Sequence, residues 1–390
     1  MALEAKVFFG EGNLAMPADA IGWLVEIRVE QELNKPTKFA LRFEDDLCEG
    51  QPAMQARDEI APGTILTVIA GAGEVEPVCL ARGPITRIRS SATVGGPGSW
   101  VEAHCETRHV EMDRVPVSAK WTGAHKGIVE GLLAHYDFTP DVADVEGTAD
   151  ESSNQLNQSG TDFAFLNKMA SDHGVDFWLS YEAVDMGPLA LVAETAHFRI
   201  SPSTANALPG AAGGFTLFPE EDAPVLRLNT VGRICRTVDS FEAEADLERP
   251  TSGQVSTVDT SQGRAVDQPT VAEPETQGEG STVESFGSVQ RTITTNGPGG
   301  PEQQTRRQEA ALRAAAWFVE GKATTSAQLL RGIVVPHQIL RVEGAGDRLS
   351  IPYQVKAVTH VITAAAHMMD VKLRSNFLGQ PAGLASENAA

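Results

Sequence analysis

The stretch SGTDFAFLNKMASDHGVDFWLSY, residues Ser159–Tyr181, has the pattern of a helix, a tight stop and a strand in one short unit. Thr161 or Asp162 can cap the helix, because a short oxygen-bearing side chain accepts hydrogen bonds from the free N–H groups of the first turn. Gly174 is the expected helix exit, since glycine adopts the left-handed conformation without a Cβ penalty. Apolar residues then alternate from Val175 to Tyr181 and predict a strand. Within the helix, three- and four-residue spacing predicts one apolar face, formed by Phe163, Leu166, Met169 and Ala170.

The order of residues in this unit is more specific than its periodicity. The run DFAFLNKMA at 162–170, followed after three residues by Gly174 and then by an aromatic strand, resembles the signature of phage late-control D proteins and VgrG-type hubs. Members of that family form the central baseplate hub of contractile phage tails, type VI secretion spikes, tailocins and extracellular injection particles. The resemblance covers most of the chain, from about residue 22 to 379.

A second part of the resemblance lies near the C-terminus. The runs IPYQVKAVTHVIT at 351–363 and MMDVKLRSN at 368–376 are similar to the last two strands of the hub module. Two departures are small. Pro352 replaces the usual small residue before the tyrosine, and Arg374 and Asn376 stand one residue apart where the family has them adjacent.

Length and composition set the broad class. A chain of 390 residues is typical of two or three domains. Its 36 glycines and 22 prolines, with few aromatic residues, favour many turns and β structure over long helices. The 31 basic and 52 acidic residues give a net charge of −21, which argues against a general nucleic-acid coat or a binder of anionic membranes. Such an acidic surface keeps a protein soluble, faces basic partners, or lines a passage that repels nucleic acid.

Cysteine usage and the apolar segments indicate the compartment. Cys48, Cys79, Cys105 and Cys235 contain no CxxC pair and are far apart, as expected for unpaired thiols in a reducing compartment. The N-terminal MALEAKVFFGEG lacks the pattern of a secretion signal, and no segment approaches eighteen consecutive apolar residues, so we expect no membrane span. We therefore expect assembly in the cytoplasm and, from the resemblance, a final place in the baseplate of a phage tail or injection particle.

Turns and apolar runs predict a mainly β fold with an α+β insert. Residues 1–105 predict a first small β-barrel domain, because short alternating strands are separated by turn chemistry. Residues 106–205 predict an α+β insert domain with two amphipathic helices, each leading to an apolar strand. Residues 206–385 predict a second β-barrel with a long polar loop at 259–304 and a helix at 302–321, and 386–390 form a tail. In this last region strands are expected at 225–228, 231–238, 328–335, 353–362 and 368–377.

Two further features concern duplication and order. The runs GPITRIRSS at 83–91 and PYQVKAVTHVI at 352–362 are β runs near the ends of comparable β regions, which indicates a weak internal repeat. The segment 259–304 has too few apolar residues to offset an ordering entropy of about 1–2 kcal/mol per residue. It is predicted to be an exposed loop, or an arm that is ordered only against a partner.

No sequence motif for catalysis or cofactor binding is present. There is no GxxxxGK[ST], no GxGxxG after a strand, no HExxH and no GxSxG. His104 with His109, and His360 with His367, come nearest to metal-ligand spacing. The first two are expected to point to opposite faces of a strand, and His360 is expected to face solvent.

The carboxylates and aromatics near the opening stretch have structural explanations. Asp162 is expected to be a cap and Asp172 a solvated helix residue, so these two and Asp176 do not predict a glycosidase pair. Phe177 and Trp178 should point to opposite faces of their strand, one into the core and the other toward a neighbouring element or subunit. We expect no catalytic, cofactor-binding or metal-binding residues, and a protein that is not an enzyme.

The resemblance implies a structural hub. Three copies would form a ring, in which two barrels per chain match a hexameric tail tube on one side and a central spike on the other. The chain stops at Ala390 after a short polar tail, so the spike is expected to be a separate protein. Expected partners are two further copies, the tail-tube protein, the spike and other baseplate proteins. Alternatives are a baseplate-associated peptidoglycan hydrolase, with Cys105 and His104 as the pair to inspect, or a ligand-binding β-barrel module. The sequence leaves open whether the particle is a phage, a tailocin, a type VI apparatus or an extracellular injection system.

Overall fold

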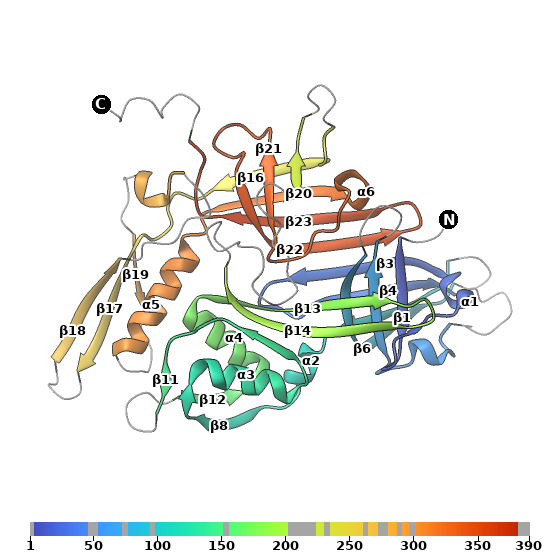
Figure 1. Cartoon of the computed structure of the whole chain (residues 1–390), viewed down its shortest axis with the longest axis horizontal. Coiled ribbons are helices and arrows are strands. Elements are labelled where there is room, and N and C mark those ends of the chain that lie inside the picture. Colours follow the sequence, from blue (N-terminus) through green and yellow to red (C-terminus); the bar gives the residue numbers. More distant parts are fainter. Residues whose placement is uncertain are drawn as a thin grey trace.

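The computed structural model describes residues 4–45, 54–71, 77–93, 98–150, 156–201, 224–229, 235–259, 264–271, 280–286, 291–295 and 301–380. Strands predominate in both terminal regions, and an α+β unit lies between them in the chain (Figure 1). The predicted class, mainly β with an α+β insert, is confirmed. Over the described ranges, no helix is long and apolar enough to cross a membrane.

Thirteen strands form one sheet that passes through both β regions. Eight of them lie side by side in the order β16 (Ser240–Ala245), β20 (Val319–Ser326), β23 (His367–Ser375), β22 (Pro352–Thr363), β3 (Leu24–Glu32), β4 (Lys38–Glu44), β7 (Trp100–Glu106) and β6 (Val78–Ser91). Beyond β6 follow β5 (Ile65–Ala70), β1 (Ala5–Phe9) and β2 (Leu14–Ala15), and β15 (Val225–Arg227) reaches β22 through β21 (Ile339–Glu343). The two β regions, predicted as barrels, are thus joined edge to edge by the pairing of β22 with β3.

The α+β unit holds the opening stretch. Helix α4 (Asp162–His173) is capped by the Thr161 side chain, which accepts from the Ala164 backbone N–H, and it ends at Gly174 with φ of +64°. Its following strand β13 (Val175–Asp185) pairs with β14 (Ala190–Ile200), which pairs in parallel with β10 (Thr139–Val142). The remaining elements are α2 (His109–Met112), β8 (Val117–Trp121), β9 (Gly123–Ala124), α3 (His125–His135), β11 (Thr148–Ala149) and β12 (Leu156–Gly160).

Two hydrophobic cores correspond to this division. One joins buried side chains of both β regions, from Val7 to Leu378, across the β22–β3 seam. The other fills the α+β unit around Phe177 and Phe198 and also takes in Phe8 and Cys79 of the first β region. Cys79, Cys105 and Cys235 are free thiols, as predicted, and Cys48 lies outside the described residues.

The predicted helix at 302–321 is too long. Helix α5 covers Pro301–Ala315, and the chain then enters β20. From Val319 every second residue is buried, as in a strand, so the apolar side chains beyond Ala315 follow a two-residue period.

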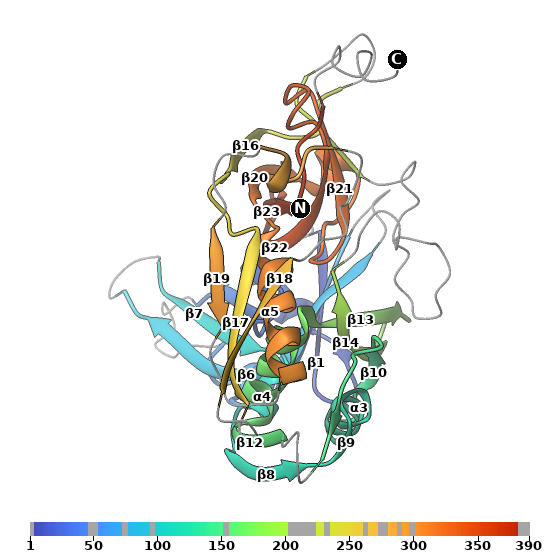
Figure 2. The ribbon, with the colours of Figure 1, turned by 90° about the vertical axis from the view of Figure 1, so that its left-hand side faces the viewer.

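The predicted loop at 259–304 is also wrong in part. Strand β17 (Ser252–Asp259) pairs with β18 (Arg264–Val271) and β19 (Thr292–Thr295), and a short 3₁₀ turn covers Val283–Phe286. Helix α5 lies against this small sheet in both views (Figure 1 and Figure 2). Main-chain pairing and cover from the helix order a segment whose own apolar content is low.

Two of the predicted strands in the second β region are not formed. At 328–335 the structure has the short helix α6 (Ala327–Leu330), capped by the Ser326 side chain and ended by Arg331 in the left-handed conformation. At 231–238, the described residues 235–238 belong to no strand, and 231–234 lie outside the described ranges.

The seam between β22 and β3 contains a buried histidine pair. His360 does not face solvent as predicted: it is fully buried, with its Nδ1 atom 3.0 Å from Nε2 of His367 and its Nε2 atom 3.2 Å from Oε1 of Gln31. Gln31 in turn donates to the Leu80 carbonyl. The alternation predicted for Val355, Ala357, Thr359 and Val361 failed because a bulge at Lys356 shifts the phase of β22, so that His360 shares the buried face with Val358 and Ile362.

The α+β unit is attached to the second β region by polar and stacking contacts. Asp176, at the start of β13, lies 2.6 Å from the guanidinium of Arg374 on β23. Arg374 also donates to Gln354 and lies 4.4 Å above the Trp317 ring. Next to this pair, the Trp178 ring stacks on His337 with centroids 3.9 Å apart. The motif arginine near the C-terminus therefore fastens the opening stretch to the sheet.

Gly83 marks the point where β6 passes from β5 to β7. Pairing with β5 extends to Pro84, and pairing with β7 begins at Ile85. A Cβ atom on Gly83 would lie 2.0 Å from the Glu106 carbonyl oxygen, which is main chain and cannot rotate away. We expect Gly83→Ala to lower the free energy of unfolding by about 3 kcal/mol or more, measured by thermal or urea unfolding.

Gly131 in α3 provides the matched control. A Cβ atom there would meet nothing within 4 Å. Gly131→Ala should raise stability by about 0.5–1 kcal/mol, because alanine is the better helix former. Equal effects of the two substitutions would contradict the close approach at Gly83.

Arg374→Ala should be strongly destabilising, because it leaves the Asp176 carboxylate buried and unpaired. The two side chains are 14% and 6% exposed, and the expected loss is about 3–5 kcal/mol in urea unfolding. Arg28, whose side chain is 49% exposed in its pair with Glu30, is the control. Arg28→Ala should cost less than about 1 kcal/mol. A similarly small loss for Arg374→Ala would show that this ion pair does not hold the unit in place.

The buried histidine pair predicts loss of stability in acid. Burial lowers the pKa of His367 to about 4 and that of His360 well below its usual value. The unfolded chain, with imidazole pKa values near 6.5, therefore binds protons first as the pH falls. The free energy of unfolding should decrease between about pH 6.5 and 4, by up to about 1.4 kcal/mol per pH unit for each histidine. Urea unfolding across this range tests it, and an unchanged slope in His360→Gln would contradict the assignment.

Candidate functional site

The eight central strands consist of two halves with the same strand order. In chain order the first half is β3, β4, β6, β7, and the second is β16, β20, β22, β23. Within the sheet, the first strand of each half lies beside the second, the second beside the fourth, and the fourth beside the third, counted in chain order. The halves are therefore arranged head to tail, and the third strand of one half, β22, pairs with the first strand of the other, β3.

Matching bulges support this equivalence. In β6 the extra residue opposite β7 is Thr86, between Ile85 and Arg87. In β22 the extra residue opposite β23 is Lys356, between Val355 and Ala357. The resemblance between 83–91 and 352–362 thus reflects equivalent third strands, and the predicted internal repeat is confirmed.

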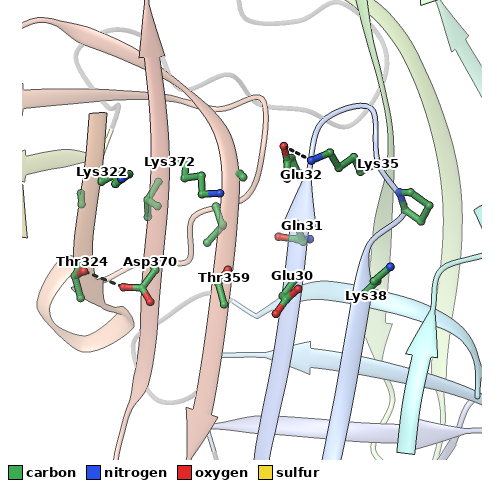
Figure 3. A pocket seen from close by; sticks show the side chains of 15 residues that line it. Glu30, Gln31, Glu32, Lys35, Lys38, Lys322, Thr324, Thr359, Asp370 and Lys372 are labelled. Atoms are coloured by element: carbon green, nitrogen blue, oxygen red, sulfur yellow. Dashed lines mark hydrogen bonds and ion pairs between the residues drawn. The ribbon is translucent and has the colours of Figure 1, made fainter. Parts of the chain in front are cut away.

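One face of this sheet is polar and carries an open groove of about 470 Å³ over the seam (Figure 3). The groove spans β20, β23, β22, β3 and β4. Opposite charges lie beside one another on it: Glu30 stands across from Lys38, and Lys35 lies 2.9 Å from Glu32. Lys322 and Lys372 are direct cross-strand neighbours of like charge. The arrangement is a mixed-charge surface and offers no enclosed chamber for a small molecule.

The two outer edges of the eight-stranded sheet carry opposite charges. In the described part of the chain, β16 pairs only with β20, and residues 86–91 of β6 pair only with β7. The β6 edge exposes Arg87 and Arg89, and the β16 edge exposes Glu242 and Glu244. Exposed strand edges are templates for pairing with another strand. The two edges are therefore complementary in charge as well as in backbone hydrogen bonding.

A third arrangement lies on the β10–β14–β13 sheet. The Ser180 hydroxyl is 2.7 Å from Nε2 of His197, and Nδ1 of His197 is 2.6 Å from Oδ2 of Asp141. Arg199 donates to the other oxygen of Asp141. Burial raises the pKa of Asp141, but the hydrogen bonds from His197 and Arg199 outweigh it and hold that pKa at about 2. The carboxylate is ionised at neutral pH.

Sequence reasoning missed this relay because its members come from three strands and match no motif spacing. The only signal was the alternation of β13, which places Ser180 on the face of Trp178. Cross-strand pairing with β14 could not be read from either segment alone.

The residues weighed from the sequence lie apart. His104 contacts Glu102 at 2.8 Å, whereas His109 is buried beside Phe163. Cys105 is buried in the core, where burial raises its thiol pKa, so it forms no reactive pair with His104. In the ranges that the structure covers, no group of three or more His, Cys, Asp or Glu residues is placed to hold a metal ion.

The three carboxylates near α4 point to separate partners. Asp162 accepts from Tyr136 and Gln158, and the cap is Thr161. Asp172 is not a free solvated residue as predicted, because it pairs with Arg307 at 3.1 Å. Asp176 is the partner of Arg374 described above.

No protein-family model matches the chain, and no curated protein matches it. Solved structures match over nearly its whole length. The 43 kDa tail protein of prophage MuSo2 from Shewanella oneidensis has a TM-score of 0.61 at 10% identity, covering 95% of this chain and 98% of that one. The tail protein from Neisseria meningitidis MC58 has the same TM-score and identity, with 96% and 97% covered.

A component of the Escherichia coli type VI secretion system, described as similar in structure to the bacteriophage T4 tail proteins gp27 and gp5, has a TM-score of 0.52 at 11% identity, with 92% of this chain and 76% of that chain covered. At these identities the comparison establishes the fold. The chain has the fold of phage tail proteins and of a type VI secretion component.

Proposed function

We propose that the protein is a structural hub of a contractile tail or injection particle, in which three copies form a ring between the tail tube and a separate spike. The shared fold with tail proteins supports the general role. The observation that carries the proposal is the head-to-tail repeat, whose outer edges, β16 and β6, are the counterparts of the edges already joined inside the chain.

The joint inside the chain predicts the register of a joint between copies. Aligning the halves at their bulges makes Arg89 equivalent to Thr359 and, through the strand pairings, Glu244 equivalent to Glu30. Thr359 stands opposite Glu30 at the internal seam. Arg89 of one copy should therefore stand opposite Glu244 of the next.

The same alignment brings a second acid–base pair together. Arg87 is equivalent to Ala357, which stands opposite Glu32, and Glu32 is equivalent to Asp246. Arg87 should thus meet Asp246 across the joint. Opposite charges that face one another across strands each contribute about 0.2–1 kcal/mol, and like charges there repel.

Three copies joined in this way give six equivalent four-stranded units around one axis. This number matches the six-fold symmetry of a tail tube with half as many chains. Closing the ring also leaves no free edge at β6 or β16, which avoids open-ended aggregation. The role is structural, and the hydrolase and ligand-binding alternatives gain no support from the mixed-charge groove.

Charge reversal on either edge should prevent ring formation. Light scattering of the purified protein should give a trimer for the wild type, and monomers for Arg87→Glu/Arg89→Glu and for Glu244→Arg/Asp246→Arg. Combining all four substitutions in one chain restores opposite signs across the joint and should restore the trimer.

Lys38→Glu/Lys372→Glu is the matched control. It reverses two exposed charges on the same face, on β4 and β23, neither of which is an edge strand. This variant should remain trimeric. A wild-type monomer at every concentration, or a trimer that tolerates either edge reversal, would contradict the proposed joint.

A further inference from the structure

We propose that Ser180 is an activated nucleophile that accepts an acyl group from small esters, with His197 as its base and Asp141 as the residue that positions His197. The proposal rests on the β10–β14–β13 sheet and does not depend on the proposed hub function.

The atoms follow the order that nucleophilic catalysis requires. Asp141 lies directly beside His197 in the parallel β10–β14 register, and Ser180 lies diagonally across from His197 on β13. The hydroxyl meets Nε2 at 2.7 Å, and the carboxylate meets Nδ1 at 2.6 Å. Base, nucleophile and positioning group recur in this order on unrelated folds, so geometry and not sequence order identifies them.

The carboxylate fixes the tautomer of the ring. An ionised Asp141 can only accept, so Nδ1 of His197 carries the proton and Nε2 is left to accept from the Ser180 hydroxyl. Trp178 stacks on the His197 ring with centroids 4.7 Å apart, and His337 covers the other face of Trp178. The imidazole is therefore held in one orientation and is only 2% exposed.

Ser180 lies on β13 between the part of the β13–β14 hairpin that is buried around Trp178 and the part that is exposed to solvent. Trp178, two residues before it, is buried, whereas Val184, four residues after it, is 62% exposed. Leu191 stands opposite Val184 and is 59% exposed, and the exposed Glu182 lies between Ser180 and Val184 on the same face. A small ester can therefore approach the hydroxyl from an open, polar side of the hairpin. Thr195 stands directly opposite Ser180 on β14.

The step balances without an added reagent. The Ser180 oxygen bonds to the ester carbonyl carbon while His197 takes the hydroxyl proton at Nε2. The carbon–oxygen bond to the alcohol breaks, and His197 returns the proton to the departing alkoxide. Water then attacks the acyl-serine by the same route and releases the carboxylic acid.

A fluorophosphonate probe tests the nucleophile on the full-length protein. The wild type should be labelled at Ser180, located by tandem mass spectrometry, and should release p-nitrophenol from p-nitrophenyl acetate. Ser180→Ala should abolish both signals. Ser118→Ala, at an exposed serine of β8, should leave them unchanged.

Asp141→Asn tests the positioning role. It should slow labelling by at least about 10-fold and shift its pH profile, because the neutral amide no longer stabilises the imidazolium. Circular dichroism verifies that each variant is folded. Absence of label from Ser180, or labelling at the same rate and with the same pH profile in Asp141→Asn and His197→Gln, would overturn the proposal and leave the three residues as a structural hydrogen-bond network.

Discussion

The pairing of β22 with β3 is the constraint on which the rest of the structure depends. It joins strands from opposite ends of the chain and turns two β regions into one continuous sheet. The inner face of the seam is buried around the His360–His367 pair, so it tolerates no unpaired charge, whereas the outer face carries Glu30 and Glu32 in the open groove. The outer strands of the eight-stranded sheet, β16 and β6, are the counterparts of β3 and β22. Their edges are exposed and charged, whereas the edges joined at the seam are paired inside the chain. A chain that joins its own halves in this manner has the surfaces needed to join a second copy.

The α+β unit is fixed relative to that sheet by a small number of buried contacts. Asp176 and Arg374 supply the ion pair, and Trp178 lies between His197 and His337. The same stacking that anchors β13 also immobilises the ring of His197. Packing between the units and the Ser180 relay are therefore consequences of one arrangement, and a change at Trp178 would affect both.

Short sequence patterns predicted those elements that depend only on residues close together in the chain. The helix cap, the Gly174 exit and the strand that follows are specified within a few residues of one another. The exit and the strand are confirmed, and of the two cap candidates the structure has Thr161 and not Asp162. The helix predicted at 302–321 was too long because small residues such as Ala315 are compatible with both the helical period and the two-residue period of a strand. The predicted position of His360 was wrong because the bulge at Lys356, which forms only by pairing with β23, shifts the alternation of β22. The Ser180–His197–Asp141 relay and the edge complementarity likewise arise only from strand pairing, which no single segment encodes. The internal repeat was visible in the third strands, which are β runs near the ends of comparable β regions.

The register of the joint between copies is the most direct test of this account. In a Cys48→Ser/Cys235→Ser background, which leaves only the buried Cys79 and Cys105 as native thiols, Arg89→Cys combined with Glu244→Cys should form disulfides between copies under mild oxidation. Denaturing electrophoresis should then show a covalent trimer, whereas Arg89→Cys paired with Lys322→Cys should remain monomeric. Failure of the Arg89→Cys/Glu244→Cys variant to cross-link in a protein that is trimeric in solution would show that the copies associate through other surfaces, and the head-to-tail sheet would have to be abandoned.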